Sequence, residues 1–153
     1  MKKFLVSALS VGTLIAAPAA IAQSPHSYPW TLTGVVTVQK GAGPILTCGV
    51  EVVLDLVGTP AVKKATSITL TDVIDPRCAS VIFENDPYDT TYDPITHDLT
   101  IHGIYANTTI TTGDCEGDLV AEWDDIGGKY DVSGSLPEAL SGGDCTVAGE
   151  IYP

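Results

Sequence analysis

The chain is 153 residues long, the size of one domain, and carries 19 acidic residues against 7 basic ones. This excess of negative charge repels nucleic acid and anionic lipid, so neither is an expected partner. Hydrophobic residues make up 44% of the chain and recur along its whole length, which excludes low-complexity disorder.

The first residues have the layout of a secretory signal peptide. Two lysines precede an uncharged apolar run at 4–15, and Ala20 and Ala22 supply the small residues that a signal peptidase requires. The apolar run is shorter than the roughly 20 residues that a membrane-spanning helix needs. We therefore predict a signal peptide at 1–22 and an exported protein, secreted or periplasmic, with no membrane span.

After a polar leader at 23–29, the sequence predicts a single all-β domain at 30–153. Apolar residues alternate with a period of two, or gather in runs rich in β-branched residues, with Gly, Pro, Asp or Asn between the runs. About nine short strands are predicted, at 31–39, 48–57, 67–74, 80–84, 98–105, 108–112, 118–123, 129–136 and 145–152. Short strands with frequent turn signals are typical of an antiparallel β-sandwich or barrel.

The exported chain keeps four cysteines, Cys48, Cys78, Cys115 and Cys145. An even number in an oxidising compartment predicts two disulfides, and the lack of a C-x-x-C pair argues against a zinc or redox site. Four cysteines allow three pairings. The equal spacing of 30 residues in each half favours Cys48–Cys78 with Cys115–Cys145.

No catalytic constellation stands out in the sequence. The motifs of serine hydrolases, zinc proteases and phosphate-binding loops are missing, and the predicted disulfides leave no thiol nucleophile. His97 and His102 are five residues apart, which places them on opposite faces of a strand, a poor arrangement for one metal. We expect a protein that is not an enzyme and needs no cofactor.

The acidic run at 84–93 is the most cation-like stretch. Its carboxylates Glu84, Asp86, Asp89 and Asp93 could supply part of the oxygen shell of calcium, although the run lacks the Gly and terminal Glu of an EF-hand. The favoured alternative is a solvated connection between strands with Asp-Pro turns. A weaker option is that the loop at 87–94 inhibits another secreted enzyme.

The strand edges suggest a route to self-association. The predicted strands at 67–74, 80–84 and 108–112 contain no lysine, and carboxylates flank or close them instead. Low pH or cations would remove the carboxylate repulsion and allow the protein to self-associate or coat surfaces. The alternative, a well-covered domain that stays monomeric, is slightly favoured.

Several landmarks come in an order that resembles a known family of small exported bacterial proteins. They are Gln39-Lys40-Gly41, Cys48, Cys78, the stretch LTIHGI at 99–104, Cys115-Glu116-Gly117-Asp118-Leu119 and the closing segment at 145–151. This order resembles the protein activators of alkane oxidation, the PraB-like family, over most of the exported chain.

The resemblance implies an accessory role without catalytic residues. It implies help with growth on alkanes, by wetting or contacting an insoluble substrate, and a part in surface attachment and biofilm. The expected partner is then an apolar surface or another exported protein. The residues leave an alternative open: a secreted ligand- or calcium-binding β module, in which aromatic side chains grip an apolar ligand.

Overall fold

The computed structural model describes residues 28–109 and 111–153. Within them, nine strands form one antiparallel sheet, and a 3-10 turn, η1 (Pro76–Ser80), joins the third strand to the fourth. The strands are β1 (Trp30–Lys40), β2 (Leu46–Val57), β3 (Val62–Thr71), β4 (Val81–Glu84), β5 (Tyr88–Tyr92), β6 (Leu99–Thr108), β7 (Asp114–Asp124), β8 (Lys129–Leu136) and β9 (Cys145–Tyr152). The predicted signal peptide at 1–22 and the leader up to residue 27 lie outside the described residues.

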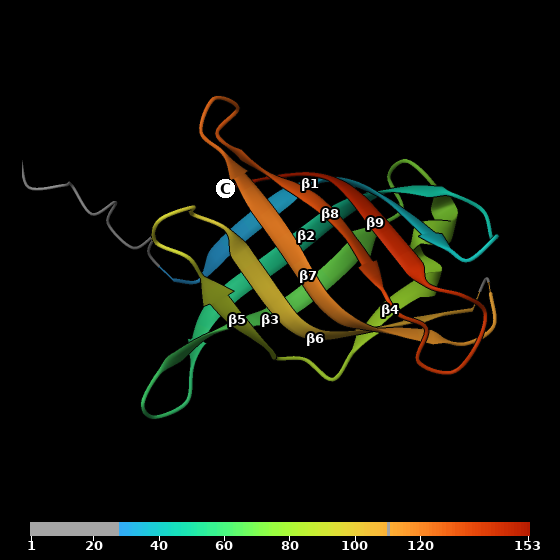
Figure 1. Cartoon of the computed structure of the whole chain (residues 1–153), viewed down its shortest axis with the longest axis horizontal. Coiled ribbons are helices and arrows are strands. Elements are labelled where there is room, and N and C mark those ends of the chain that lie inside the picture. Colours follow the sequence, from blue (N-terminus) through green and yellow to red (C-terminus); the bar gives the residue numbers. More distant parts are fainter. Residues whose placement is uncertain (1–27, 110) are drawn as a thin grey trace, which may run out of the picture.

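The sheet closes into a barrel, so the all-β prediction is confirmed and the barrel alternative is the correct one (Figure 1). Its strand order is β4-β6-β5-β3-β2-β1-β9-β8-β7, and β6 also pairs with β7. Eight strands form the ring, and β4 is an additional strand. β6 pairs with β7 along one edge, and with β5 and then β4 along the other.

Alternating side chains along each strand build the core. On β1, Leu32 and Val36 are buried inside the barrel, whereas the intervening Thr33 and Val35 face solvent. The same period of two recurs on β2, β6 and β8. Because neighbouring strands in a closed sheet present the same face inward, these residues meet in one apolar interior.

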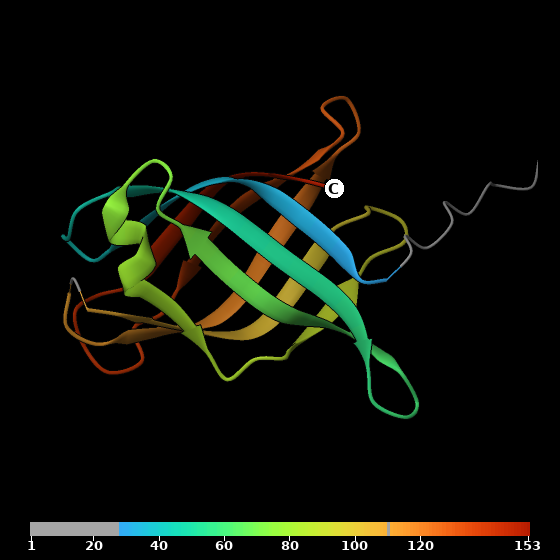
Figure 2. The ribbon, with the colours of Figure 1, turned by 180° about the vertical axis from the view of Figure 1, so that it is seen from behind.

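The barrel wall has one incomplete seam, between β3 and β4. β3 pairs with β5 only at Lys64 and Ala65, and no ladder joins the rest of this β3 edge to β4. The chain from β3 to β4 passes through η1 on this side of the molecule (Figure 2). The seam is therefore a place where side chains, without backbone hydrogen bonds, separate the interior from solvent.

Three strand predictions need correction. The predicted strand at 108–112 is wrong, because β6 continues to Thr108 and a turn with Gly113 at φ +83° follows. The third strand runs over 62–71, not 67–74, because Asp75 already caps η1. The sequence favours a solvated connection where the structure has β5, because in YDTTY only Tyr88 is buried and the polar residues around it hide the strand pattern.

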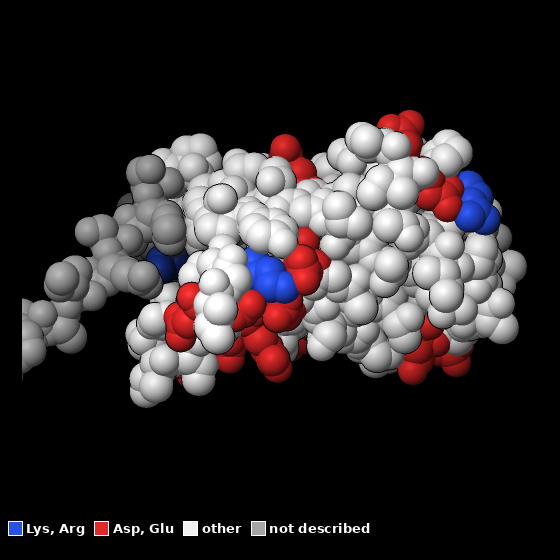
Figure 3. Space-filling model, turned by 90° about the horizontal axis from the view of Figure 1, so that it is seen from above, with Lys and Arg blue, Asp and Glu red and all other residues white. Residues whose placement is uncertain are grey.

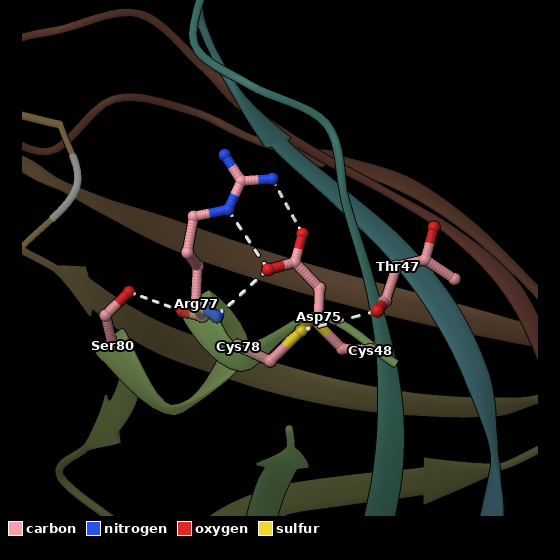
Figure 4. A network of polar contacts seen from close by, with 6 residues as sticks. All are labelled: Thr47, Cys48, Asp75, Arg77, Cys78 and Ser80. Atoms are coloured by element: carbon pink, nitrogen blue, oxygen red, sulfur yellow. Dashed lines mark hydrogen bonds and ion pairs between the residues drawn. A yellow bond between two sulfur atoms is a disulfide. The ribbon is translucent and has the colours of Figure 1, made fainter. Parts of the chain in front are cut away.

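The predicted disulfide pairing is confirmed. Cys48 bonds to Cys78 and Cys115 to Cys145, and the first three of these cysteines have no exposed surface. Cys48–Cys78 ties η1 to β2 (Figure 4). The carboxylate of Asp75 accepts hydrogen bonds from the backbone N–H and guanidinium of Arg77, which hold the pKa of Asp75 below its usual value.

Candidate functional site

The two ends of the barrel differ in what fills them. We call the end with the loops 58–61, 93–98 and 125–128 the aromatic end, because Trp30, Trp123 and Tyr130 pack together there. The ring centroids of Trp123 and Tyr130 lie 4.9 Å apart, and those of Trp30 and Tyr130 lie 6.2 Å apart. Burial raises the pKa of Tyr130 to about 12. These rings fill the interior at this end.

An apolar cavity of about 50 Å³ lies inside the barrel beyond these rings. We call it the inner cavity. Every residue that lines it is apolar: Val36, Val38, Val50, Val52, Ile68, Leu70, Phe83, Ile101, Ile104, Leu119, Ala121, Val132, Leu136, Val147 and Ile151. Cavities of this chemistry stay dry and accept apolar guests.

A second cavity, also of about 50 Å³, lies toward the opposite end, where both disulfides are found. We call this the disulfide end and the cavity the outer pocket. Apolar residues from β1, β4, β8 and β9 line much of it, and its polar lining comes from Gln39, Lys40, Asn107, Thr108 and Thr111. The exposed Pro44 at its rim shows that the pocket reaches the surface.

The inner cavity and the outer pocket share one wall. Val38, Phe83, Leu136 and Val147 line both spaces. Phe83 lies on β4, beside the incomplete seam, and is only half-buried. The two spaces therefore adjoin one another between the disulfide end and the middle of the barrel.

Lys40 is the one charged side chain among the residues that line the outer pocket. It ends β1 on the same inward alternation as Val36 and Val38, and it pairs with Cys145 of β9. Its ammonium donates to the sulfur of Cys115 at 3.5 Å. No sequence motif identifies Lys40 as a candidate binding residue. Its spacing of two from Val38 does predict that its side chain points inward.

The four carboxylates of the candidate calcium run do not come together. Asp89 pairs with Lys64 at 2.8 Å, which holds the pKa of Asp89 below its usual value. Asp93 accepts backbone N–H groups in its own turn, and Glu84 accepts from Asn107 at 3.2 Å. The described residues contain no group of three or more His, Cys, Asp or Glu placed to hold a metal, so Asp86 and the other carboxylates of this run form no such cluster.

The same stretch is not a free inhibitory loop either. Most of 87–94 is β5, which pairs with both β3 and β6 and buries Tyr88 in the core. A loop that presents itself to a protease or another enzyme must leave its backbone accessible. Residues 87–94 are therefore mostly a paired strand, and not the loop on which the inhibitory interpretation depends.

His97 and His102 lie in different settings. His97 stacks on Tyr92, with ring centroids 6.2 Å apart. His102 lies at a bulge of β6, where its Nδ1 is 2.9 Å from Asp118 and its Nε2 is 2.9 Å from the hydroxyl of Thr91. Asp118 also accepts the N–H of Gly103, and together these hydrogen bonds lower its pKa. Both histidines contribute to local structure on the outer surface.

Charged groups on the outer surface are often paired. Lys129 bonds to Asp131 at 3.0 Å and to Glu150, and the lysine lowers the pKa of Glu150. Acidic side chains gather in separate patches, and much of the face in Figure 3 carries no charged side chain. In the part of the chain that the structure describes, no helix is long and apolar enough to cross a bilayer.

Comparison with known proteins supports the resemblance read from the sequence. A family model described as alkane oxidation protein activator, PraA/PraB-like, matches residues 1–153, the whole chain. Neither the curated proteins nor the solved structures include a match.

Proposed function

Because the chain belongs to the PraA/PraB-like family of alkane oxidation protein activators, we propose that it is an exported, non-catalytic accessory protein that holds an apolar chain inside its barrel. The proposal joins the accessory role implied by the family with the ligand-binding alternative. Export is supported by the two disulfides, which persist in oxidising compartments. The non-catalytic role rests on the sequence, which lacks recognisable catalytic motifs.

The observation that carries the proposal is that the inner cavity and the outer pocket adjoin at shared apolar side chains; we call the two spaces together the path. Several inward side chains, among them Val38, Ile68, Phe83 and Val147, are only partly buried although they point into the barrel. Each packs against the buried core on one side and also lines the inner cavity or the outer pocket. Each methylene moved from water into such a space contributes about 0.8 kcal/mol, so the gain from a chain of several carbons would offset the cost of displacing wall side chains.

Filling the path is expected to abolish this binding. In Val38→Phe the larger ring occupies the wall shared by both spaces, so we expect the affinity for decane and decanol to fall at least tenfold. The measurement is displacement of an environment-sensitive fluorescent probe from the purified exported protein. Val35→Phe is the matched control, because Val35 is on the same strand but faces solvent.

The control variant should bind as the natural protein does. Equal affinity of Val38→Phe and Val35→Phe for decane would place the ligand outside the barrel. No displacement by any apolar chain in the natural protein would contradict the proposed function itself.

A second candidate function is attachment to an apolar surface, which would serve alkane contact or biofilm. Two aliphatic side chains project from loops at the aromatic end: Ile95 is 88% exposed and Ile126 is fully exposed. Burial of one isoleucine at an oil surface is worth about 1.5–3 kcal/mol. Closure of the barrel favours this route over pairing of strand edges, because most edges are already used.

Removal of both side chains tests the second candidate. We expect Ile95→Ser with Ile126→Ser to need at least tenfold more protein to lower the dodecane–water interfacial tension by the same amount. Leu140→Ser is the control, because Leu140 is 75% exposed but lies at the disulfide end. If Leu140→Ser needs as much additional protein as the double variant, the aromatic end has no special part in contact with the oil.

A further inference from the structure

We propose that the outer pocket binds the carboxylate of a single-chain fatty acid through Lys40, with the alkyl chain extending toward the inner cavity. This inference rests on the proposed function, since it assigns the ligand class and orientation in the same barrel. A carboxylate-terminated chain is what full oxidation of a terminal alkane carbon produces. The site would therefore take the oxidised product in preference to the hydrocarbon itself.

The first argument is the burial of Lys40. Only 6% of the surface of Lys40 is exposed, and no other charged or polar residue in the described part of the chain is buried to this extent. Lysines normally keep their ammonium in water, and a buried ammonium is normally paired with an anion. Here the backbone alternation of β1 points the side chain inward, so the burial follows from the fold.

The second argument is the missing anion. None of the ion pairs found in 28–109 and 111–153 includes Lys40. Its hydrogen-bond partner is the disulfide sulfur of Cys115, and sulfur is a weak acceptor. Three carboxylates at this end have other partners: Asp114 accepts from Tyr105, Glu138 from the N–H of Gly143, and Asp144 from the N–H of Glu138.

The third argument is an unsatisfied hydroxyl in the same pocket. The Oγ1 of Thr111 is buried and has no hydrogen-bond partner among the described residues. Thr111 and Lys40 both line the outer pocket. A carboxylate has two acceptor oxygens, so it can accept from an ammonium and from a hydroxyl at once.

The size and surroundings of the pocket favour one chain with one negative charge. Cavities of about 50 Å³ admit a single alkyl chain more readily than the paired chains of a phospholipid. The rest of the protein is strongly acidic, which disfavours ligands with several negative charges. A fatty acid meets both conditions.

The test compares ten-carbon ligands that differ in their head group. Decanoate, decanol and decyltrimethylammonium are titrated below their micelle concentrations against the purified exported protein, with affinity read by probe displacement. We expect decanoate to bind at least tenfold more tightly than decanol, and the cationic ligand to bind more weakly than either. Equal affinity for decanoate and decanol would overturn this inference while leaving the proposed function intact.

Variants then assign the preference to Lys40. Lys40→Met keeps the length and apolar stem of the side chain, and replacement of a buried charge by an apolar isostere is usually tolerated. We expect it to reduce the decanoate preference to less than threefold and to leave decanol affinity within threefold. Lys63→Met removes the same charge from an exposed position and should retain the preference.

A measurement on the natural protein guards against misfolding of the variant. A ligand selective for the folded state raises the melting temperature, and we expect decanoate to raise it more than decanol at equal concentration.

A preference for decanoate that persists in folded Lys40→Met would overturn the assignment to Lys40. Tighter binding of decyl phosphate than of decanoate would overturn the choice of a carboxylate. Failure of decane, decanol and decanoate alike to bind would instead remove the proposed function.

Discussion

Replacing Cys48 and Cys78 with alanine is expected to lower the free energy of unfolding by about 3–4 kcal/mol. The disulfide closes a loop with a sequence separation of 30 residues, and opening such a loop restores conformational entropy of this size to the unfolded chain. The bond also anchors η1 to β2 beside the seam where β3 and β4 share no ladder. Urea denaturation followed by tryptophan fluorescence measures the loss.

The second disulfide provides the matched comparison. Cys115–Cys145 has the same sequence separation of 30, so its removal should cost a similar free energy. Cys145 lines the outer pocket and the sulfur of Cys115 contacts Lys40. Only the second double variant should therefore weaken ligand binding. A loss below about 1 kcal/mol for the Cys48–Cys78 variant would contradict the role given to that bond.

The sequence was most informative where structure is local. Alternation along 31–39, 48–57, 129–136 and 145–152 predicted four long strands, because one face of each is buried in the core and the other meets solvent. The cysteine spacing also predicted the disulfide pairing. Within residues 30–153, each disulfide joins two cysteines of the same half, and both pairs have a sequence separation of 30 residues.

The sequence was least informative where structure depends on distant partners. β5 is polar apart from Tyr88, and becomes a strand because β3 and β6 offer it hydrogen bonds. Barrel closure depends on β6 pairing with β7 as well as with β4 and β5, which no local pattern encodes. The acidic run is the most cation-like stretch of the sequence, but in the folded protein Asp89, Asp93 and Glu84 each have a different partner.

The candidate site could likewise be predicted only where it depends on local structure. The inward position of Lys40 could be predicted from its spacing to Val36 and Val38, but its importance could not. A lysine at the end of a strand ordinarily reaches solvent, and the disulfide end covers this one. The cavities that make the charge unusual arise from side chains on several strands, and their volume is a property of packing alone.

Gly34→Ala is expected to destabilise the protein by about 3 kcal/mol, at the upper end of overpacking effects. A Cβ at position 34 would lie 1.9 Å from the carbonyl oxygen of Glu150 and 2.7 Å from the Cα of Ile151. Both are backbone atoms of β9, so no rotamer change can make room. β1 and β9 would have to separate along the ladder that also places Lys40 opposite Cys145.

A substitution at the neighbouring Val35 tests whether β1 is sensitive to any substitution or only to the clash at Gly34. Val35→Ala shortens an outward side chain that is 46% exposed, so we expect its free energy of unfolding to stay within about 0.5 kcal/mol of the natural protein. Chemical denaturation of both variants gives the comparison. If Gly34→Ala proves as stable as Val35→Ala, β1 and β9 do not approach as closely as described, and the wall that carries Val38 and Lys40 must be placed differently.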